Sequence, residues 1–110
     1  MAITYDGGLT CALGVSDLDQ AIGWYRDVLG FELLYRRDDI GWCELTTGID
    51  KVNVGLSERR EGSGAGGATL TFGVTDIEAA KAMLDTKGVR QDGDIMEIAG
   101  LVRLLTFFDP

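Results

Sequence analysis

Among the side chains of the sequence that could do acid–base chemistry, the clearest candidate is Glu44. It lies in the short run Trp42–Thr46, where apolar and polar residues alternate as they do in a strand. In a strand, Trp42, Glu44 and Thr46 share one face, which puts a carboxylate beside an indole ring. A carboxylate there could bind a cation or act as a base, and the indole could stack on a flat ligand.

Composition excludes several other kinds of chemistry. The 110 residues contain no histidine, which rules out Ser-His-Asp and Cys-His catalysis and removes the commonest ligand of zinc, nickel and iron. Cys11 and Cys43 lie between apolar neighbours, so we expect buried, reduced thiols. A net charge of −8 opposes binding to nucleic acid or to an anionic membrane. With no spanning or signal segment in the sequence, we expect a cytoplasmic protein.

The elements that must position Glu44 are arranged as a tandem repeat. Val15–Phe31 runs from a valine through a hydroxyl residue and an aspartate into a helix closed by Gly30, and Val74–Val89 repeats this order and closes at Gly88. A hydroxyl residue followed by aspartate is typical of a helix start, and a glycine just past the last apolar residue is typical of its end. We therefore expect two helices, each with one buried face.

Alternating runs around these helices predict the strands, which lie at 9–15, 31–35, 42–46, 52–57, 70–74, near 89–91 and at 101–108. The chain therefore reads as one α+β domain over residues 1–110, made of two βαβββ units at about 8–58 and 68–110. A glycine-rich linker at 61–67 joins them. The counterpart of strand 52–57 would follow Pro110, so the last strand of the second unit is missing, either because this unit is naturally short or through truncation, which we expect.

These residues carry a family resemblance. The stretch Val15–Phe31, its echo at Val74–Gly88 and the terminal residues 108–110 resemble the vicinal oxygen chelate superfamily, the group of glyoxalases, bleomycin-resistance proteins and extradiol dioxygenases. The resemblance covers essentially the whole chain and does not specify a reaction. It implies paired βαβββ units whose sheets curl into a cup, with the helices outside and a ligand or metal inside.

The resemblance also says where the metal ligands of that superfamily would fall. They would be Thr10, Thr69 and a residue near Gly55, with a fourth in the strand expected after Pro110. Threonine hydroxyls and a glycine do not supply the donors that divalent zinc, nickel or iron requires. The resemblance is therefore one of fold, and we expect no cofactor.

The lining of the expected cup follows from strand parity. If Thr10 and Thr69 point inward, the small residues that share their side of the strands leave room for a ligand. Aligning the two units makes Glu44 and Arg103 equivalent positions of the repeat. Glu44 and Arg103 either contact the ligand or form a structural ion pair. The expected ligand-binding residues are Thr10, Trp42, Glu44, Thr46, Gly55, Thr69, Arg103, Leu105 and Phe107.

These observations favour a metal-independent protein of the bleomycin-resistance type, which sequesters a small cationic or aromatic ligand, as in antibiotic resistance, without transforming it. The alternative is an enzyme, either a metal-dependent lyase, isomerase or dioxygenase, or a metal-free variant in which Glu44 moves a proton. A third reading is an interaction domain without a pocket. We further expect a homodimer, with Trp24 and Tyr25 in the core or at the dimer interface.

Overall fold

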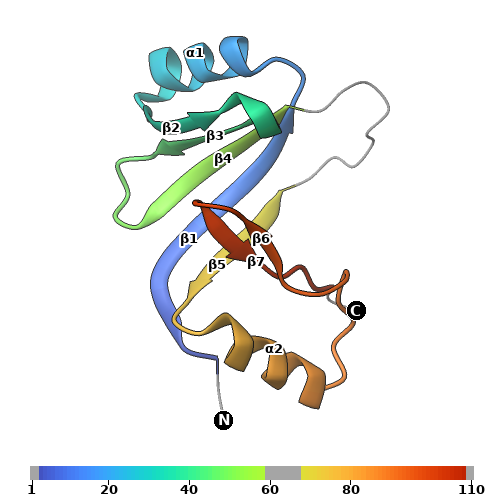
Figure 1. Cartoon of the computed structure of the whole chain (residues 1–110). Coiled ribbons are helices and arrows are strands. Elements are labelled where there is room, and N and C mark those ends of the chain that lie inside the picture. The colour runs from blue at the N-terminus through green and yellow to red at the C-terminus, as the bar shows by residue number, and fades with distance from the viewer. Residues whose placement is uncertain (1–2, 59–67, 109–110) are drawn as a thin grey trace. The chain divides into compact units, whose positions relative to one another are not determined.

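The computed structural model describes residues 3–58 and 68–108 (Figure 1). Two compact units divide the chain, residues 7–73 as the first, and residues 1–6 with 74–110 as the second. The predicted α+β class is confirmed. The elements in chain order are β1 (Tyr5–Val15), α1 (Leu18–Leu29), β2 (Glu32–Arg37), the short 3-10 helix η1 (Asp38–Ile40), β3 (Trp42–Thr46), β4 (Val52–Glu58), β5 (Thr69–Val74), α2 (Ile77–Thr86), β6 (Met96–Ile98) and β7 (Val102–Leu104).

The larger sheet has the strand order β2-β3-β4-β1-β5. β1 runs parallel to β4, and β3 is antiparallel to both β2 and β4. The β1–β4 register sets Thr10 opposite Asn53 and Ala12 opposite Gly55. This pairing brings residues that are more than 40 positions apart in the sequence onto neighbouring strands of one face.

Helix α1 is closed at both ends by specific groups. The carboxylate of Asp17 accepts a hydrogen bond from the backbone N–H of Gln20 at 3.0 Å, and the Glu58 carboxylate accepts one from the N–H of Leu18 at 2.9 Å. These acceptors satisfy donors that the first turn of a helix cannot satisfy itself. Gly30 ends the helix with φ of 75°, in the left-handed region that glycine adopts without strain. Neither described helix is long and apolar enough to cross a membrane.

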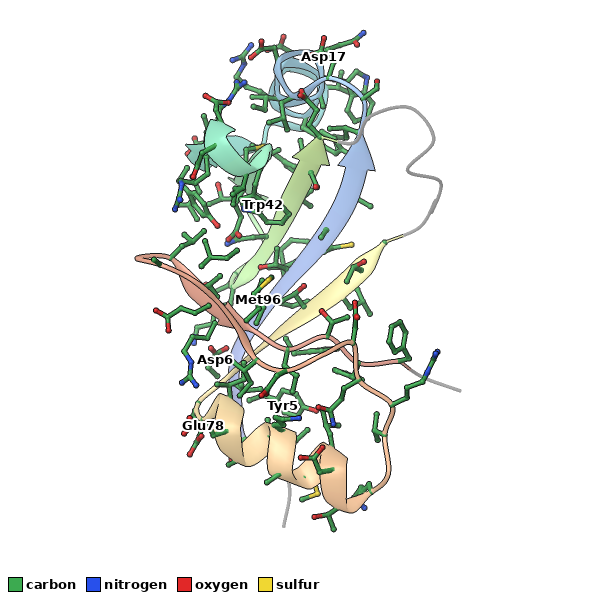
Figure 2. The ribbon with its side chains drawn as sticks, turned by 45° about the vertical axis from the view of Figure 1, so that its right-hand side comes forward. Tyr5, Asp6, Asp17, Trp42, Glu78 and Met96 are labelled. Atoms are coloured by element: carbon green, nitrogen blue, oxygen red, sulfur yellow. The ribbon has the colours of Figure 1, made fainter. Side chains whose placement is uncertain are left out.

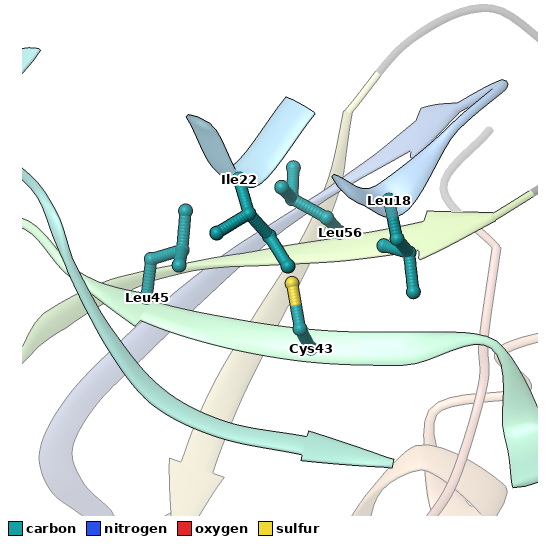
Figure 3. Packing of buried hydrophobic residues seen from close by; sticks show 5 residues of the cluster. All are labelled: Leu18, Ile22, Cys43, Leu45 and Leu56. Atoms are coloured by element: carbon teal, nitrogen blue, oxygen red, sulfur yellow. The ribbon is translucent and has the colours of Figure 1, made fainter. Parts of the chain in front are cut away.

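The core of the first unit lies between α1 and the sheet. Five side chains from three elements are buried there, namely Leu18, Ile22, Cys43, Leu45 and Leu56 (Figure 3). The alternation in β3 and the helical spacing in α1 point these residues toward one another. Cys43 is a free, fully buried thiol, as predicted, and burial raises its pKa. Cys11 is also free, but it is only partly buried, unlike the prediction.

The second unit repeats this arrangement with a smaller sheet. The Asp76 carboxylate accepts hydrogen bonds from the N–H groups of Glu78 and Ala79, both at 3.0 Å, which starts α2 as the sequence predicted. The helix buries Ala80, Met83 and Leu84. β6 and β7 pair antiparallel as a two-stranded sheet.

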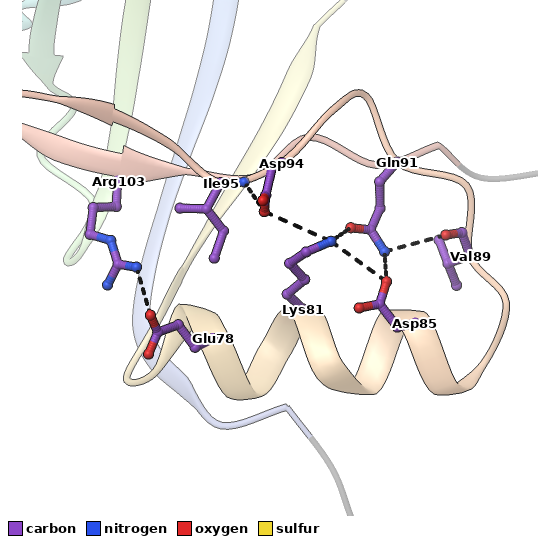
Figure 4. Close-up of polar contacts among 8 residues, drawn as sticks. All are labelled: Glu78, Lys81, Asp85, Val89, Gln91, Asp94, Ile95 and Arg103. Atoms are coloured by element: carbon purple, nitrogen blue, oxygen red, sulfur yellow. Dashed lines mark hydrogen bonds and ion pairs between the residues drawn. The ribbon is translucent and has the colours of Figure 1, made fainter.

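One strand prediction in the second unit was wrong, and one strand was not predicted. Near 89–91 only Gln91 makes a bridge, to Phe107, and the strand that pairs with β7 is β6, which the sequence did not predict. The Gln91 side chain is held by α2, because its amide oxygen accepts from Lys81 at 2.7 Å and its amide nitrogen donates to Asp85 at 2.8 Å (Figure 4). These contacts fix the segment as a loop on the helix.

Strand β2 carries a β-bulge. Its pairing with β3 changes register between Leu33 and Tyr35, so that Leu34 is an extra residue and Tyr35 lies opposite Glu44. In an unbroken register Tyr35 would lie opposite Cys43, whose side chain faces α1. The bulge therefore turns Tyr35 to the same face as Glu44.

Candidate functional site

The face of the larger sheet that is turned away from α1 carries most of the residues predicted to bind a ligand in the first unit. Side chains alternate between the two faces of a strand, so the residues that lie between the buried positions of β3 and β4 point away from α1. We call it the polar face. Its residues are Thr10 and Ala12 of β1, Tyr35 of β2, Trp42, Glu44 and Thr46 of β3, and Asn53 and Gly55 of β4.

Glu44 is the centre of a hydrogen-bonded network on the polar face. The Tyr35 hydroxyl donates to Glu44 Oε1 at 3.3 Å, and the Asn53 amide donates to Glu44 Oε2 at 2.9 Å. The indole Nε1–H of Trp42 donates to the Tyr35 hydroxyl oxygen at 3.0 Å. We call Tyr35, Trp42, Glu44 and Asn53 the Glu44 network. Each carboxylate oxygen keeps a second lone pair for a further partner.

The environment of Tyr35 favours its neutral form. Burial raises the pKa of the Tyr35 phenol, and the negative charge of Glu44 raises it further, while the hydrogen bond from Trp42 acts in the opposite direction. Tyr35 therefore stays a hydroxyl donor to Glu44 at neutral pH.

The indole of Trp42 lies across β4 over Gly55. A Cβ atom added to Gly55 would lie 2.9 Å from Cζ3 of the ring and closer still to Cη2 and Cζ2. Real Cβ atoms do not approach other atoms this closely, so only glycine fits beneath the ring. Gly55 is buried, and the side of β4 nearest Trp42 is filled rather than open.

The predicted threonines are less engaged than Glu44. Thr10 lies opposite Asn53 and is partly buried, while Thr69 is exposed at the first position of β5. The Thr46 hydroxyl reaches the backbone carbonyl of Glu32 at 3.5 Å. Thr10 and Thr46 both lie opposite Asn53, from β1 and β3 respectively, so the pairing register puts both next to the Glu44 network.

The three predicted residues of the second unit have other neighbours. The Arg103 guanidinium donates to the Glu78 carboxylate in the first turn of α2 at 3.1 Å (Figure 4). Leu105 is partly buried, and Phe107 is exposed and bridges to Gln91 through its backbone. Glu44 and Arg103 thus each have a partner within their own unit, and ligand binding by the residues of the second unit stays a prediction.

Sequence reasoning missed two members of the Glu44 network. Asn53 could have been found, because it has the same strand parity as Gly55 and would be expected beside Glu44 on the antiparallel neighbour. Tyr35 carried no such signal, because its orientation depends on the bulge at Leu34, which leaves no mark in the alternation of β2.

A cavity of about 270 Å³ lies elsewhere in the first unit, beside the N-terminal half of α1. Its only ionisable groups are Asp17, whose carboxylate caps the helix, and Tyr25, whose ring packs against Trp24 and Phe31 with centroids 5.0 and 5.8 Å apart. Both groups therefore have structural roles, Asp17 as the cap of α1 and Tyr25 in the core. The polar face (Trp42 is labelled in Figure 2) is therefore the candidate site.

The order of elements and the βαβββ pairing are those of a glyoxalase-type α+β protein. The family described as Glyoxalase/Bleomycin resistance protein/Dioxygenase superfamily matches residues 9–110, and the chain belongs to it. No curated protein matches the chain.

Solved structures agree with the family. Methylmalonyl-CoA epimerase from Mycobacterium tuberculosis is 27% identical, with a TM-score of 0.77 over 98% of this chain and 83% of that one. The Streptomyces coelicolor methylmalonyl-CoA epimerase in complex with 2-nitronate-propionyl-CoA is 22% identical, with a TM-score of 0.72 over 97% and 89%. A superfamily member from Vibrio splendidus is 24% identical, with a TM-score of 0.62 over 90% and 84%.

The described residues do not fit the metal site that the superfamily implies. They contain no group of three or more His, Cys, Asp or Glu side chains that could hold an ion. Two of the positions that the resemblance assigns to ligands are Thr10 and Gly55, and Gly55 lies under the Trp42 ring. Glu44 is a single carboxylate, which is too few donors for zinc, nickel or iron.

Proposed function

We propose that the chain is an isomerase-type member of the superfamily, which binds a small carbonyl compound of the acyl thioester class on the polar face and moves a proton with Glu44. The support for the reaction class is the likeness to methylmalonyl-CoA epimerase at 27% identity over 98% of the chain. Epimerisation beside a carbonyl requires a proton to leave carbon and return. This proposal departs from ligand sequestration, which the sequence alone favoured.

The observation that carries the proposal is the placement of Glu44. Its carboxylate is partly buried and is fixed by Tyr35 and Asn53, so it is positioned as a base needs to be. In the proposed step, Glu44 takes the proton from the carbon beside the carbonyl. The C–H electron pair becomes the carbon–carbon double bond of the enolate, and the π pair of the carbonyl moves onto its oxygen. The reverse electron movement returns a proton to the carbon and restores the carbonyl. Asn53 has a second amide hydrogen able to stabilise that oxygen. No step is assigned to a metal, because the described donors do not hold one.

Deuterium exchange tests the proposal without assuming a stereochemical outcome. Methylmalonyl-CoA and a small uncharged 2-methyl-3-oxo thioester are incubated with the protein in D₂O, and loss of the C2 proton is followed by NMR. Exchange should exceed the protein-free blank and fall roughly 10²–10⁴-fold in Glu44→Gln.

The matched control is Asp27→Asn, which changes an exposed acid on α1, on the opposite side of the sheet from the polar face. Exchange in this variant should equal that of the wild type. Exchange no faster than the blank, or equal rates in wild type and Glu44→Gln, would remove the isomerase proposal.

A second candidate function is sequestration of a cationic aromatic compound without reaction, as proposed from the sequence. Two observations favour it: the net charge of −8, and the Glu44 carboxylate, which the Tyr35 hydroxyl links to the Trp42 indole. Glu44→Gln should then weaken binding of bleomycin, used as the cationic probe in calorimetric titration, by roughly 1–3 kcal/mol. Binding of the probe together with no thioester exchange would favour this function, and a role in antibiotic resistance would follow from it.

Association of two copies and a cytoplasmic location also stay proposals. The support for association is the outer side of α1, where Trp24 is 51% and Val28 59% exposed. The Tyr25 ring, in contrast, stacks on Phe31 and belongs to the core. Sedimentation equilibrium at tens of micromolar should show a mass near twice 11.9 kDa, and Trp24→Ser should shift it toward the monomer. A monomer at all concentrations would contradict association.

A further inference from the structure

Trp42 and Gly55 form a matched pair on neighbouring strands. Trp42 is opposite Ser57 in the β3–β4 register, and Gly55 is opposite Glu44, so the indole leans diagonally across β4 to cover the glycine. On its other side Gly55 lies opposite Ala12 of β1, another small residue. A ring the size of indole can lie here because both neighbours are small.

The Glu44 network holds the ring in this place. The Nε1–H of Trp42 is fixed by the Tyr35 hydroxyl at 3.0 Å, which is itself tied to Glu44. Asn53 holds the same carboxylate from β4 at 2.9 Å. The position of the indole is therefore set by hydrogen bonds from β2 to β4, and not only by contact with Gly55.

This arrangement conflicts with the metal site of the superfamily that the chain belongs to. The resemblance puts a metal ligand near Gly55, and any side chain there would need the volume that the Trp42 ring fills. Glu44 is the carboxylate opposite Gly55, and a single carboxylate is too few donors for zinc, nickel or iron. Cys43, the nearest thiol, is buried on the opposite face of β3.

We infer that Trp42 closes the ligand position at Gly55, so that this chain's polar face meets its ligand through an indole surface and the hydrogen-bonding groups of Tyr35, Glu44 and Asn53 instead of through a divalent metal ion. The inference concerns how the site is built, and it holds for either of the two proposed functions. Its tests therefore measure the Trp42–Gly55 pair and metal binding directly, without an activity assay.

The first test is Gly55→Ala in a Trp24→Phe background, where Trp42 is the only tryptophan. The new methyl group would overlap the ring, so the ring must move. We expect the fluorescence emission to shift to longer wavelength and the thermal midpoint to fall by roughly 5–15 °C. The control is Gly23→Ala in α1, where a Cβ meets only the Arg26 guanidinium at 3.8 Å. In this variant the emission should not shift to longer wavelength, and the thermal midpoint should not fall.

A double-mutant cycle distinguishes the clash between Trp42 and a side chain at position 55 from a general effect of alanine on the stability of β4. Trp42→Ala removes the ring, so Gly55→Ala added to it should lower the thermal midpoint by a few degrees at most. An equal loss from Gly55→Ala with and without Trp42 would overturn the inference. Because Trp42→Ala creates space and does not overfill it, the cycle remains readable if Gly55→Ala alone fails to fold.

The second test measures metal binding. The wild-type protein is equilibrated with Co²⁺, Ni²⁺ or Zn²⁺, desalted and examined by elemental analysis, and its thermal midpoint is recorded with and without each ion. We expect a metal content well below one ion per chain and an unchanged midpoint. One retained ion per chain, removed by a chelator with a fall in the midpoint, would overturn the inference even if thioester exchange were absent.

Discussion

Replacing Glu44 by leucine tests whether the Glu44 network contributes to folding as well as to chemistry. Glu44→Leu leaves the Asn53 amide and the Tyr35 hydroxyl without their acceptor. A hydrogen bond to a charged group contributes about 1.5–3 kcal/mol. The Tyr35 bond, at 3.3 Å, is longer than the usual O–H···O distance and adds little. Because the network is partly exposed and water replaces part of the loss, we expect about 2 kcal/mol in the free energy of unfolding.

Urea unfolding at pH 7, followed by circular dichroism, measures this change. The midpoint should fall with an unchanged slope, since the surface exposed on unfolding is the same. Glu44→Gln keeps one acceptor oxygen and should lose about half as much. The Asn53→Ala variant measures the coupling between Asn53 and Glu44. This substitution should lower the free energy of unfolding less in the Glu44→Leu background than in the wild type. Wild-type stability in Glu44→Leu, or additive losses in the double variant, would refute the network as described.

Three further predictions concern the first unit. Leu45→Ala removes a side chain that is 1% exposed and should cost roughly 2–5 kcal/mol in urea unfolding, whereas the exposed Leu33→Ala should stay within about 0.5 kcal/mol. Because burial raises the folded-state pKa of Tyr35, its contribution to stability is complete below about pH 10 and is lost as pH rises through the raised value. Tyrosinate absorbance should therefore show a late-titrating phenol, which Tyr35→Phe removes. The Cys43 thiol, with Cys11 changed to serine, should react with Ellman's reagent roughly a hundredfold or more slowly in the native protein than in urea, and equal rates would contradict its burial.

Much of the first unit could be predicted because its local signals agree with its packing. Asp17 and Gly30 start and end α1 where the sequence indicated, and the alternation in β3 separates Glu44 from the buried Cys43. Parity of this kind is reliable when one face of a strand is buried against a helix. The same alternation predicted that Trp42, Glu44 and Gly55 share one face of the sheet.

The rest depended on contacts that a single sequence does not display. β6 is only Met96–Ile98, too short for alternation to stand out, and its partner is decided by the turn before β7. Arg103 was placed by aligning the repeats, but a long side chain reaches whichever acid is nearest, which here is Glu78. The position of the Trp42 ring over Gly55 depends on a diagonal contact between strands, which no linear pattern reports.

The extra residue in β2 also affects how copies of the protein behave at high concentration. β2 is the outer strand of the sheet order, and Leu33 and Leu34 are 48% and 53% exposed. An outer strand with exposed leucines is a template for fibril-like pairing when its backbone is regular. The bulge interrupts that regularity, and charged Arg36 and Arg37 follow it directly. Deleting Leu34 would straighten the strand while keeping Tyr35 opposite Glu44, so the cost of the deletion should appear as aggregation during storage and not as lost ligand binding.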